Sequence, residues 1–399
     1  MLTADAVNLF FESASIRRWN DQVRPVEFTE LDKQSHKMII AWLIAHSEPA
    51  SSREAPAFWN LLIEGGIFEL LQRTVLTDIK PHVFHRMMQD NSAEVNAFLK
   101  EKLRGVLQGM NADLYERFCS YLDDPAYARL QKQILHAAHY LATNWEFRII
   151  YNFCKGIYGI DKTRREIENQ IEDHYDLLGV RKISLGKKTA QLVDLCGQLR
   201  FQRRWSQSPR IPETSVLGHM YTVGIMAYIC ALDLDACNRR LYNDFYGGLF
   251  HDLPEVLTRD ITSPVKSGVE GLEETLKQYE KRAMENDLLP LCPAELRDEL
   301  RYYTEEEFEN RIMDNGELRG GLSTEKINVE YNADEFSPVD GQIIRTCDHL
   351  AAYTEACISD RYGITSIHLQ EGRDRLLERY ADKVVGGLQF GPVFRGLAG

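Results

Sequence analysis

The chain has 399 residues, of which 44% are hydrophobic and 27% charged, and its 47 basic and 60 acidic side chains give a formal net charge of −13. This composition is typical of a globular protein and excludes a disordered chain, a collagen-like fibre and a small disulfide-stabilised scaffold. The acidic balance also argues against non-specific binding to polymeric nucleic acid.

Apolar residues recur at helical spacing through most of the chain. The pattern predicts an all-α protein with a boundary in the loop-like stretch 179–188, so that residues 1–184 form an N-terminal helical region of unknown role and residues 185–399 form a second domain. The clearest amphipathic helices are expected around residues 41–44, 58–63, 134–141, 222–232, 244–252 and 342–358.

Two stretches of the second half depart from this pattern. Ile327, Val329 and Tyr331 alternate with polar residues, which predicts a short strand or hairpin over residues 326–331. Residues 270–340 carry 8 basic and 20 acidic side chains, a net charge of −12. We expect this acidic stretch to be a solvated insertion that serves as a lid or a partner surface and does not hold a phosphate.

Three features of the sequence predict a cytoplasmic protein. The eight cysteines are scattered without a Cys-x-x-Cys pair, which is typical of reduced thiols. Residues 1–11 contain an acid and no basic region before a long apolar run, so a secretory signal is not expected there. No stretch of 18 consecutive apolar residues occurs, so we expect no membrane span.

Two histidines and two aspartates lie on three of the predicted helices in the second half. His219 opens one helix, His251 and Asp252 close another just before Pro254, and Asp348 lies in a third. Imidazole nitrogens and carboxylate oxygens from three helices can converge on one divalent cation such as Mn, Fe, Co, Ni or Zn. Four such ligands on a six-coordinate ion leave positions for water and substrate. An adjacent His-Asp pair is also common by chance, so the spacing alone does not establish a metal site.

The flanking residues carry a resemblance to a known family. Residues 251–266 read His-Asp-Leu-Pro-Glu-Val-Leu-Thr-Arg-Asp-Ile-Thr-Ser-Pro-Val-Lys. This run resembles the signature of the HD superfamily of metal-dependent phosphohydrolases, and it is most similar to the bacterial 5′-deoxynucleotidase branch. The pair Arg204-Trp205 ends fourteen residues before His219, the spacing of the substrate-contacting pair in that branch. The resemblance covers about residues 200–270 and 340–358.

The resemblance implies an HD-type helical bundle with one divalent metal ion. The metal ligands would be His219, His251, Asp252 and Asp348, and these residues do not distinguish Mn, Co, Fe, Ni, Zn or Mg. The family has a Glu directly before its first histidine, whereas Gly218 stands there in this chain. No histidine occurs between Asp252 and Asp348, which favours one metal over the two-metal members of the superfamily.

The same resemblance assigns five further residues. Glu255 and Asp260 would lie beside the metal as catalytic residues. Asp260 would orient or deprotonate the attacking water, and Glu255 would act as general acid or base or position the phosphate through water. Arg204 and Lys266 would bind the phosphate, and Trp205 would contact a sugar or base. In the alternative reading, Arg204 belongs to a solvated basic turn and Trp205 to the core.

The function implied is divalent-metal-dependent hydrolysis of a phosphomonoester by metal-activated water, with a nucleoside 5′-monophosphate as the leading substrate. The expected partner is therefore a small phosphorylated molecule, with no polymeric nucleic acid and no membrane, and homo-oligomerisation stays open. Two alternatives remain at this point. The domain could sense a nucleotide through its metal site without turnover, or the chain could be an interaction scaffold whose working part is the N-terminal half.

Overall fold

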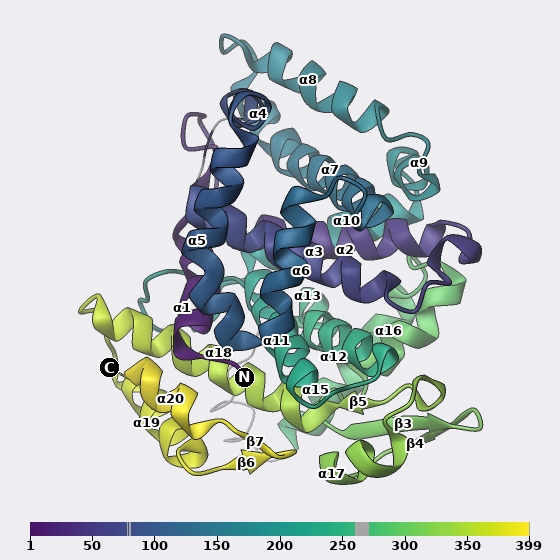
Figure 1. Ribbon diagram of the computed structural model, residues 1–399, viewed down its shortest axis with the longest axis vertical. Helices are drawn as coiled ribbons and strands as arrows, with labels where there is room; N and C mark the ends of the chain where they lie inside the picture. The colour runs from purple at the N-terminus through teal and green to yellow at the C-terminus, as the bar shows by residue number, and fades with distance from the viewer. Residues whose placement is uncertain (78, 80, 260–270, 399) are drawn as a thin grey trace. The chain divides into compact units, whose positions relative to one another are not determined.

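The computed structural model (Figure 1) describes residues 1–77, 79, 81–259 and 271–398. Helices dominate these residues and the strands are short, which confirms the all-α fold class. The chain divides into two compact units. One comprises Met1–Val180 and Leu232–Asn238, and the other comprises Arg181–Ala231 and Arg239–Gly399.

The first unit is built around α2, which packs against α3 and α7. Thr29 caps α2 by accepting a hydrogen bond from the backbone N–H of Asp32 at 3.2 Å. The buried face of this helix includes charged residues, and Lys37 Nζ pairs with Glu69 at 2.8 Å. The elements are α1 (Ala4–Glu12), β1 (Arg17–Arg18), β2 (Phe28–Thr29), α2 (Glu30–Ser47), α3 (Phe58–Leu76), α4 (Pro81–Asp90), α5 (Ser92–Met110), α6 (Ala112–Asp123), α7 (Arg129–Cys154) and α8 (Ile160–Glu172), with short 3₁₀ turns at Ser13–Ser15 and Ala50–Arg53.

The second unit contains the residues that carry the HD resemblance. After α9 (Leu178–Ser184), its elements are α10 (Lys188–Gln198), η3 (Leu199–Phe201), α11 (Val216–Asp233), α12 (Asn238–Phe250), α13 (Glu255–Thr258), α15 (Leu272–Ala283), η4 (Met284–Leu288), η5 (Ala294–Leu296), α16 (Arg297–Thr304), β3 (Asn310–Asp314), β4 (Glu317–Arg319), α17 (Thr324–Lys326), η6 (Ile327–Tyr331), η7 (Asp334–Phe336), β5 (Val339–Asp340), α18 (Gly341–Arg361), α19 (Ile367–Tyr380), β6 (Val384–Val385), β7 (Leu388–Gln389) and α20 (Gly391–Ala398). Helices α18, α19 and α20 pack against one another.

Helices α11 and α12 approach each other at two glycines. A Cβ atom added to Gly248 would lie 2.7 Å from the Cα of Gly224, and one added to Gly224 would lie 2.8 Å from the carbonyl oxygen of Phe245. Both distances are shorter than a Cβ tolerates against backbone. The two backbones therefore touch at this point, which only residues without a side chain allow.

α11 is also the one helix of the described residues that is long and apolar enough to cross a membrane by length and composition. In the structure 89% of this window is buried. A core helix passes the same test, so the apolar character of α11 is explained by its packing inside the second unit.

The expected strand over residues 326–331 is wrong. Residues 324–331 form α17 and the π-helical turn η6, and Ser323 caps α17 by accepting from the N–H of Lys326 at 3.1 Å. Ile327 is fully buried whereas Val329 is 85% exposed, so the two residues do not share the face that a strand would give them. The strands lie elsewhere in this stretch, where β3 pairs antiparallel with both β4 and β5.

The acidic stretch 270–340 is folded into the second unit. Leu288, Tyr303 and Ile312 from this stretch are fully buried. Most of its carboxylates lie on the surface, and several pair with nearby cations, as Glu305 does with Lys281 at 3.1 Å. The excess negative charge is therefore carried on the outside of a segment that has its own apolar contacts.

The glycine contact yields a first prediction. Gly248→Ala should lower the free energy of unfolding by about 1–3 kcal/mol, because the added methyl group must push α11 and α12 apart. Gly105→Ala is the matched control, since a Cβ there meets nothing within 4 Å and alanine is the better helix former. Urea denaturation followed by circular dichroism measures both variants. Equal stability of the two variants would contradict the close packing described here.

Candidate metal centre

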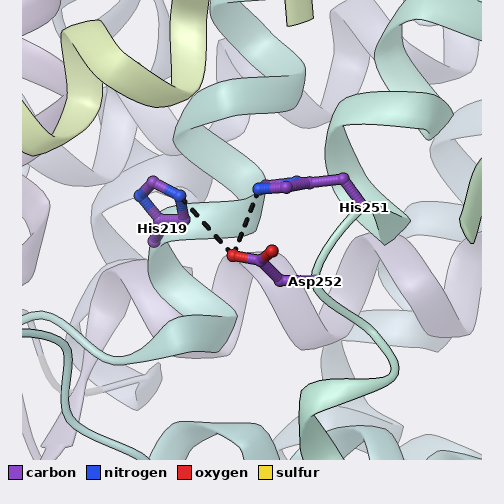
Figure 2. A group of neighbouring side chains, drawn as sticks. All are labelled: His219, His251 and Asp252. Atoms are coloured by element: carbon purple, nitrogen blue, oxygen red, sulfur yellow. Dashed lines mark ion pairs between the residues drawn. The ribbon is translucent and has the colours of Figure 1, made fainter. Parts of the chain in front are cut away.

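The two histidines of the candidate centre lie on the helices that touch at the glycines. His219 is in the first turn of α11, and His251 directly follows Phe250, the last residue of α12. Both rings are buried, and their centres lie 5.5 Å apart. The close approach of α11 and α12 therefore brings both imidazoles to one place, as Figure 2 shows.

The backbone fixes the orientation of the His251 ring. Nδ1 lies 2.8 Å from the carbonyl oxygen of Gly248. A carbonyl oxygen only accepts hydrogen bonds, so Nδ1 donates, and Nε2 is the nitrogen whose lone pair becomes available when the ring gives up its second proton to bind a cation. Nε2 lies 3.2 Å from Oδ2 of Asp252 (Figure 2). This nitrogen is thus directed into the space that the other side chains of the centre face.

Two carboxylates complete the group. His219 Nε2 lies 2.9 Å from Oδ1 of Asp348 and 3.8 Å from Oδ2 of Asp252. The ligand atoms of His219, His251 and Asp252 all lie within 4.8 Å of one another. The structure therefore gathers three of the four predicted ligands in one cluster and places Asp348 against it through His219.

The donor set fits a divalent metal ion. Nδ1 of His219 is buried without a hydrogen-bond partner among the described residues, whereas Nε2 of His219 and Nε2 of His251 lie 2.9 Å and 3.2 Å from carboxylate oxygens. A cation held between these nitrogens and the carboxylates would stabilise both kinds of group, which burial separates from water. Two imidazole nitrogens with carboxylate oxygens are the ligands that borderline divalent cations prefer.

Electrostatics within the group favour ionised carboxylates. Burial alone would lower the pKa of His251, but the neighbouring Asp252 outweighs it and raises this pKa to about 9. Burial would raise the pKa of Asp252, but His251 outweighs it in turn, and this pKa falls to about 2. The pKa of Asp348 is lowered well below its usual range, since its pairing with His219 overcomes the effect of burial. Ionised carboxylates are the form that binds a cation.

Arg204, predicted as a phosphate contact, lies over this centre. Its guanidinium nitrogens lie 3.5 Å from Asp252 Oδ2 and 3.7 Å from Asp348 Oδ1. Its Nε lies 3.6 Å from Oε2 of Glu355. The side chain is 14% exposed, so the alternative reading of a fully solvated basic turn does not describe Arg204.

Glu355 is a site residue that the sequence reasoning missed. It is buried, it accepts a hydrogen bond from Nε1 of Trp205 at 2.9 Å, and the hydroxyl of Thr214 also donates to it. The carboxylate thereby anchors both members of the Arg204-Trp205 pair. Glu355 follows Asp348 by two helical turns on α18, so its position on the same helical face was the available signal.

Two cavities border the centre. One of about 350 Å³ is lined by Arg204, Trp205 and the residues up to Arg210. The other, of about 170 Å³, is lined by His251, Asp252 and the buried Glu255, together with side chains from the acidic stretch. The predicted Glu255 is thus placed beside the ligands, on the short helix α13 that begins after Pro254.

The acidic stretch therefore contributes to the wall of the centre. Glu307 lines the second cavity, and burial raises its pKa. The ring of Phe308 lies 5.9 Å from the ring of His251. The stretch is therefore not wholly solvated, because after α16 ends at Thr304 the residues that follow approach the centre. The run of glutamates gave no signal for this approach.

Two predicted residues, Asp260 and Lys266, lie outside the described residues. The structure gives no placement for the catalytic role of Asp260 or for the phosphate contact of Lys266. Both stay predictions from the resemblance.

A comparison with family models matches part of the chain. Residues 196–377 match an HD domain. The match supports the HD superfamily of metal-dependent phosphohydrolases and spans the whole ligand group from His219 to Asp348. It does not distinguish the 5′-deoxynucleotidase branch. A comparison with curated proteins gives no match to this chain.

A second prediction concerns metal content. Asp252→Ala removes the carboxylate that faces both histidines, so the affinity of the second unit for a divalent metal should fall by about 100-fold or more. Asp287→Ala removes an exposed acid of the same unit and serves as the control. Elemental analysis after dialysis against a fixed Mn²⁺ concentration reports both. Full retention of metal by Asp252→Ala would rule out the ligand set described here.

Proposed function

We propose that the second unit hydrolyses phosphomonoesters with one divalent metal ion, and that a nucleoside 5′-monophosphate is its substrate. The observation that carries this proposal is the position of Arg204, whose guanidinium lies within 3.7 Å of both candidate ligand carboxylates. A phosphate beside the metal ligands would find two parallel donors there, which is the geometry that guanidinium offers to phosphate oxygens.

The metal and the protein supply different parts of the chemistry. When bound by His219, His251, Asp252 and Asp348, a divalent cation would neutralise phosphate charge and provide Lewis acidity. Arg204 would hold the phosphate in line for attack, because its own position is fixed by Glu355. Precise positioning of this kind accounts for much of the acceleration in phosphoryl transfer.

Proton transfer would fall to carboxylates beside the ligands. Glu255 is buried at the wall of the 170 Å³ cavity and accepts, through its backbone carbonyl, a hydrogen bond from Gln202 at 2.9 Å. Its carboxylate is placed to exchange a proton with water or with the leaving alcohol. Asp260 would orient the attacking water, as the resemblance implies.

The base and sugar would occupy the cavity beside Arg204. Trp205 lines it, and the edge of its indole packs so closely on α19 that a Cβ at Gly372 would lie 2.9 Å from it. A ring held in this way offers a rigid apolar surface to a sugar or base. Such a contact would recognise a nucleoside without selecting among bases.

Phosphate release from a panel of nucleotides tests this function. Protein stripped with chelator and reloaded with Mn²⁺ or Co²⁺ should release phosphate from nucleoside 5′-monophosphates, and Arg204→Ala should reduce kcat/KM by about 100-fold. Arg375→Ala is the matched control, since Arg375 is an exposed arginine of the same unit that lines neither cavity.

Three outcomes would contradict the proposal. Nucleotide binding without phosphate release under any metal would indicate the sensing module that the Gly218 departure leaves open. Neither binding nor release would indicate a scaffold. Equal loss of kcat/KM in Arg375→Ala and Arg204→Ala would mean that Arg204 has no specific role at the phosphate.

A further inference from the structure

Three cations gather around Tyr380 at the C-terminal side of the second unit. Arg379 and Lys383 lie with their charged groups 5.6 Å and 5.2 Å from the centre of the Tyr380 ring. Arg345 on α18 is close enough to contribute to the electrostatics of the same place. Burial, followed by the charges of Arg379 and Arg345, lowers the pKa of Lys383. The three like charges therefore share one patch, which we call the cationic cluster.

The cationic cluster lacks compensating acids. Within the described part of the chain, no carboxylate lies within 4.0 Å of Arg345, Arg379 or Lys383. Other arginines of the same region are paired, as Arg373 is with Asp360 at 2.7 Å. Three uncompensated positive charges repel one another, and a bound anion would relieve that repulsion. In a chain of net charge −13, such a cluster is unusual.

The cluster adjoins the candidate metal centre. Arg345 precedes Asp348 by three residues on α18, about one helical turn. Its guanidinium lies 5.8 Å from the centre of the Phe308 ring, and the same ring lies 5.9 Å from the ring of His251. His349, next to Asp348, lies with Nδ1 2.7 Å from the hydroxyl of Tyr380. The ring of Phe308 thus lies between Arg345 and His251. On the other face of the cluster, Tyr380 contacts His349, the residue next to Asp348.

The remaining surroundings of the centre offer little positive charge to a second anion. The cavity beside Glu255 is lined mainly by carboxylates, and its cations Lys277, Lys281 and Arg301 are already paired with glutamates. Arg204 is committed to the scissile phosphate in the proposed function. Among the described residues near the centre, the cationic cluster is therefore the group of positive charges that no described carboxylate neutralises, and a second anionic group of a bound substrate would be stabilised there.

We propose that Arg345, Arg379 and Lys383 bind a second phosphate group of the substrate, so that the same centre prefers a nucleotide that carries another phosphate besides the one removed over the simple nucleoside 5′-monophosphate. This inference rests on the proposed function, because it names the substrate class of the same centre. The cluster would contribute binding energy remote from the reacting phosphorus, and its effect would appear mainly in KM.

The test compares substrates that differ by one phosphate. The full chain, loaded with Mn²⁺, is assayed with adenosine 5′-monophosphate, adenosine 5′-diphosphate and adenosine 3′,5′-bisphosphate. At least one doubly phosphorylated nucleotide should have a KM about tenfold lower than the monophosphate. The doubly phosphorylated nucleotide that has the lower KM shows whether the second phosphate is a separate ester or part of an anhydride.

Variants assign this preference to the cluster. Arg345→Gln/Arg379→Gln should raise the KM of the preferred substrate about tenfold and leave the monophosphate unchanged. Arg373→Gln removes one positive charge from α19 at a site already neutralised by Asp360. This variant should change neither the KM of the preferred substrate nor that of the monophosphate. Equal KM values for all three nucleotides, or equal effects of the double variant on all of them, would overturn the proposal.

A binding measurement separates this inference from the proposed function. Calorimetric titration of chelator-treated protein with adenosine 3′,5′-bisphosphate, adenosine 5′-diphosphate and inorganic phosphate needs no turnover. Weaker binding of a doubly phosphorylated nucleotide to the double variant, with Arg373→Gln unchanged, supports the cluster even if no metal gives activity. Binding of all three ligands that is identical in the wild type and the double variant, or a loss confined to inorganic phosphate, would overturn the inference and leave the proposed function standing.

Discussion

The contact between the backbones of α11 and α12 is the constraint on which the centre depends. Gly224 and Gly248 let the two helices meet without side chains between them. His219 and His251 lie just beyond this contact, and the carbonyl of Gly248 also orients the His251 ring. One glycine thus sets both the spacing of the helices and the direction of a candidate ligand. Adding a single methyl group at this contact would therefore displace the two helices that position the candidate ligands.

Charge is distributed unevenly around this centre, and the arrangement suits an anionic substrate in an acidic protein. The carboxylates of Asp252 and Asp348 face the two imidazoles, and Arg204 lies over both. The acidic stretch supplies one wall, where Glu307 lies near the ligands. Positive charge that no described carboxylate neutralises lies at Arg345 and its neighbours, next to Phe308 of the same stretch. Local charge, and not the net charge of the chain, decides which ligand such a site attracts.

The sequence predicted the helical class and the residues that the structure gathers, because helical periodicity and a sixteen-residue signature are local patterns. It failed over residues 326–331, where alternation suggested a strand but Val329 faces solvent. It also missed Glu355, Glu307 and Phe308. Glu355 shares a helical face with Asp348, but its contacts with Arg204 and Trp205 arise from tertiary packing. The approach of Glu307 and Phe308 to the centre after α16 leaves no mark in spacing or composition. The glycine contact was equally invisible, because two glycines in separate helices do not show that they meet.

The most direct test of the central claim is anomalous diffraction from crystals of the full chain grown with Mn²⁺, measured at the manganese edge. The account predicts one anomalous peak bonded to imidazole nitrogens of His219 and His251 and to the carboxylates of Asp252 and Asp348, at metal–ligand distances of about 2.0–2.3 Å. No peak between α11 and α12, or a peak held by other side chains, would contradict the account.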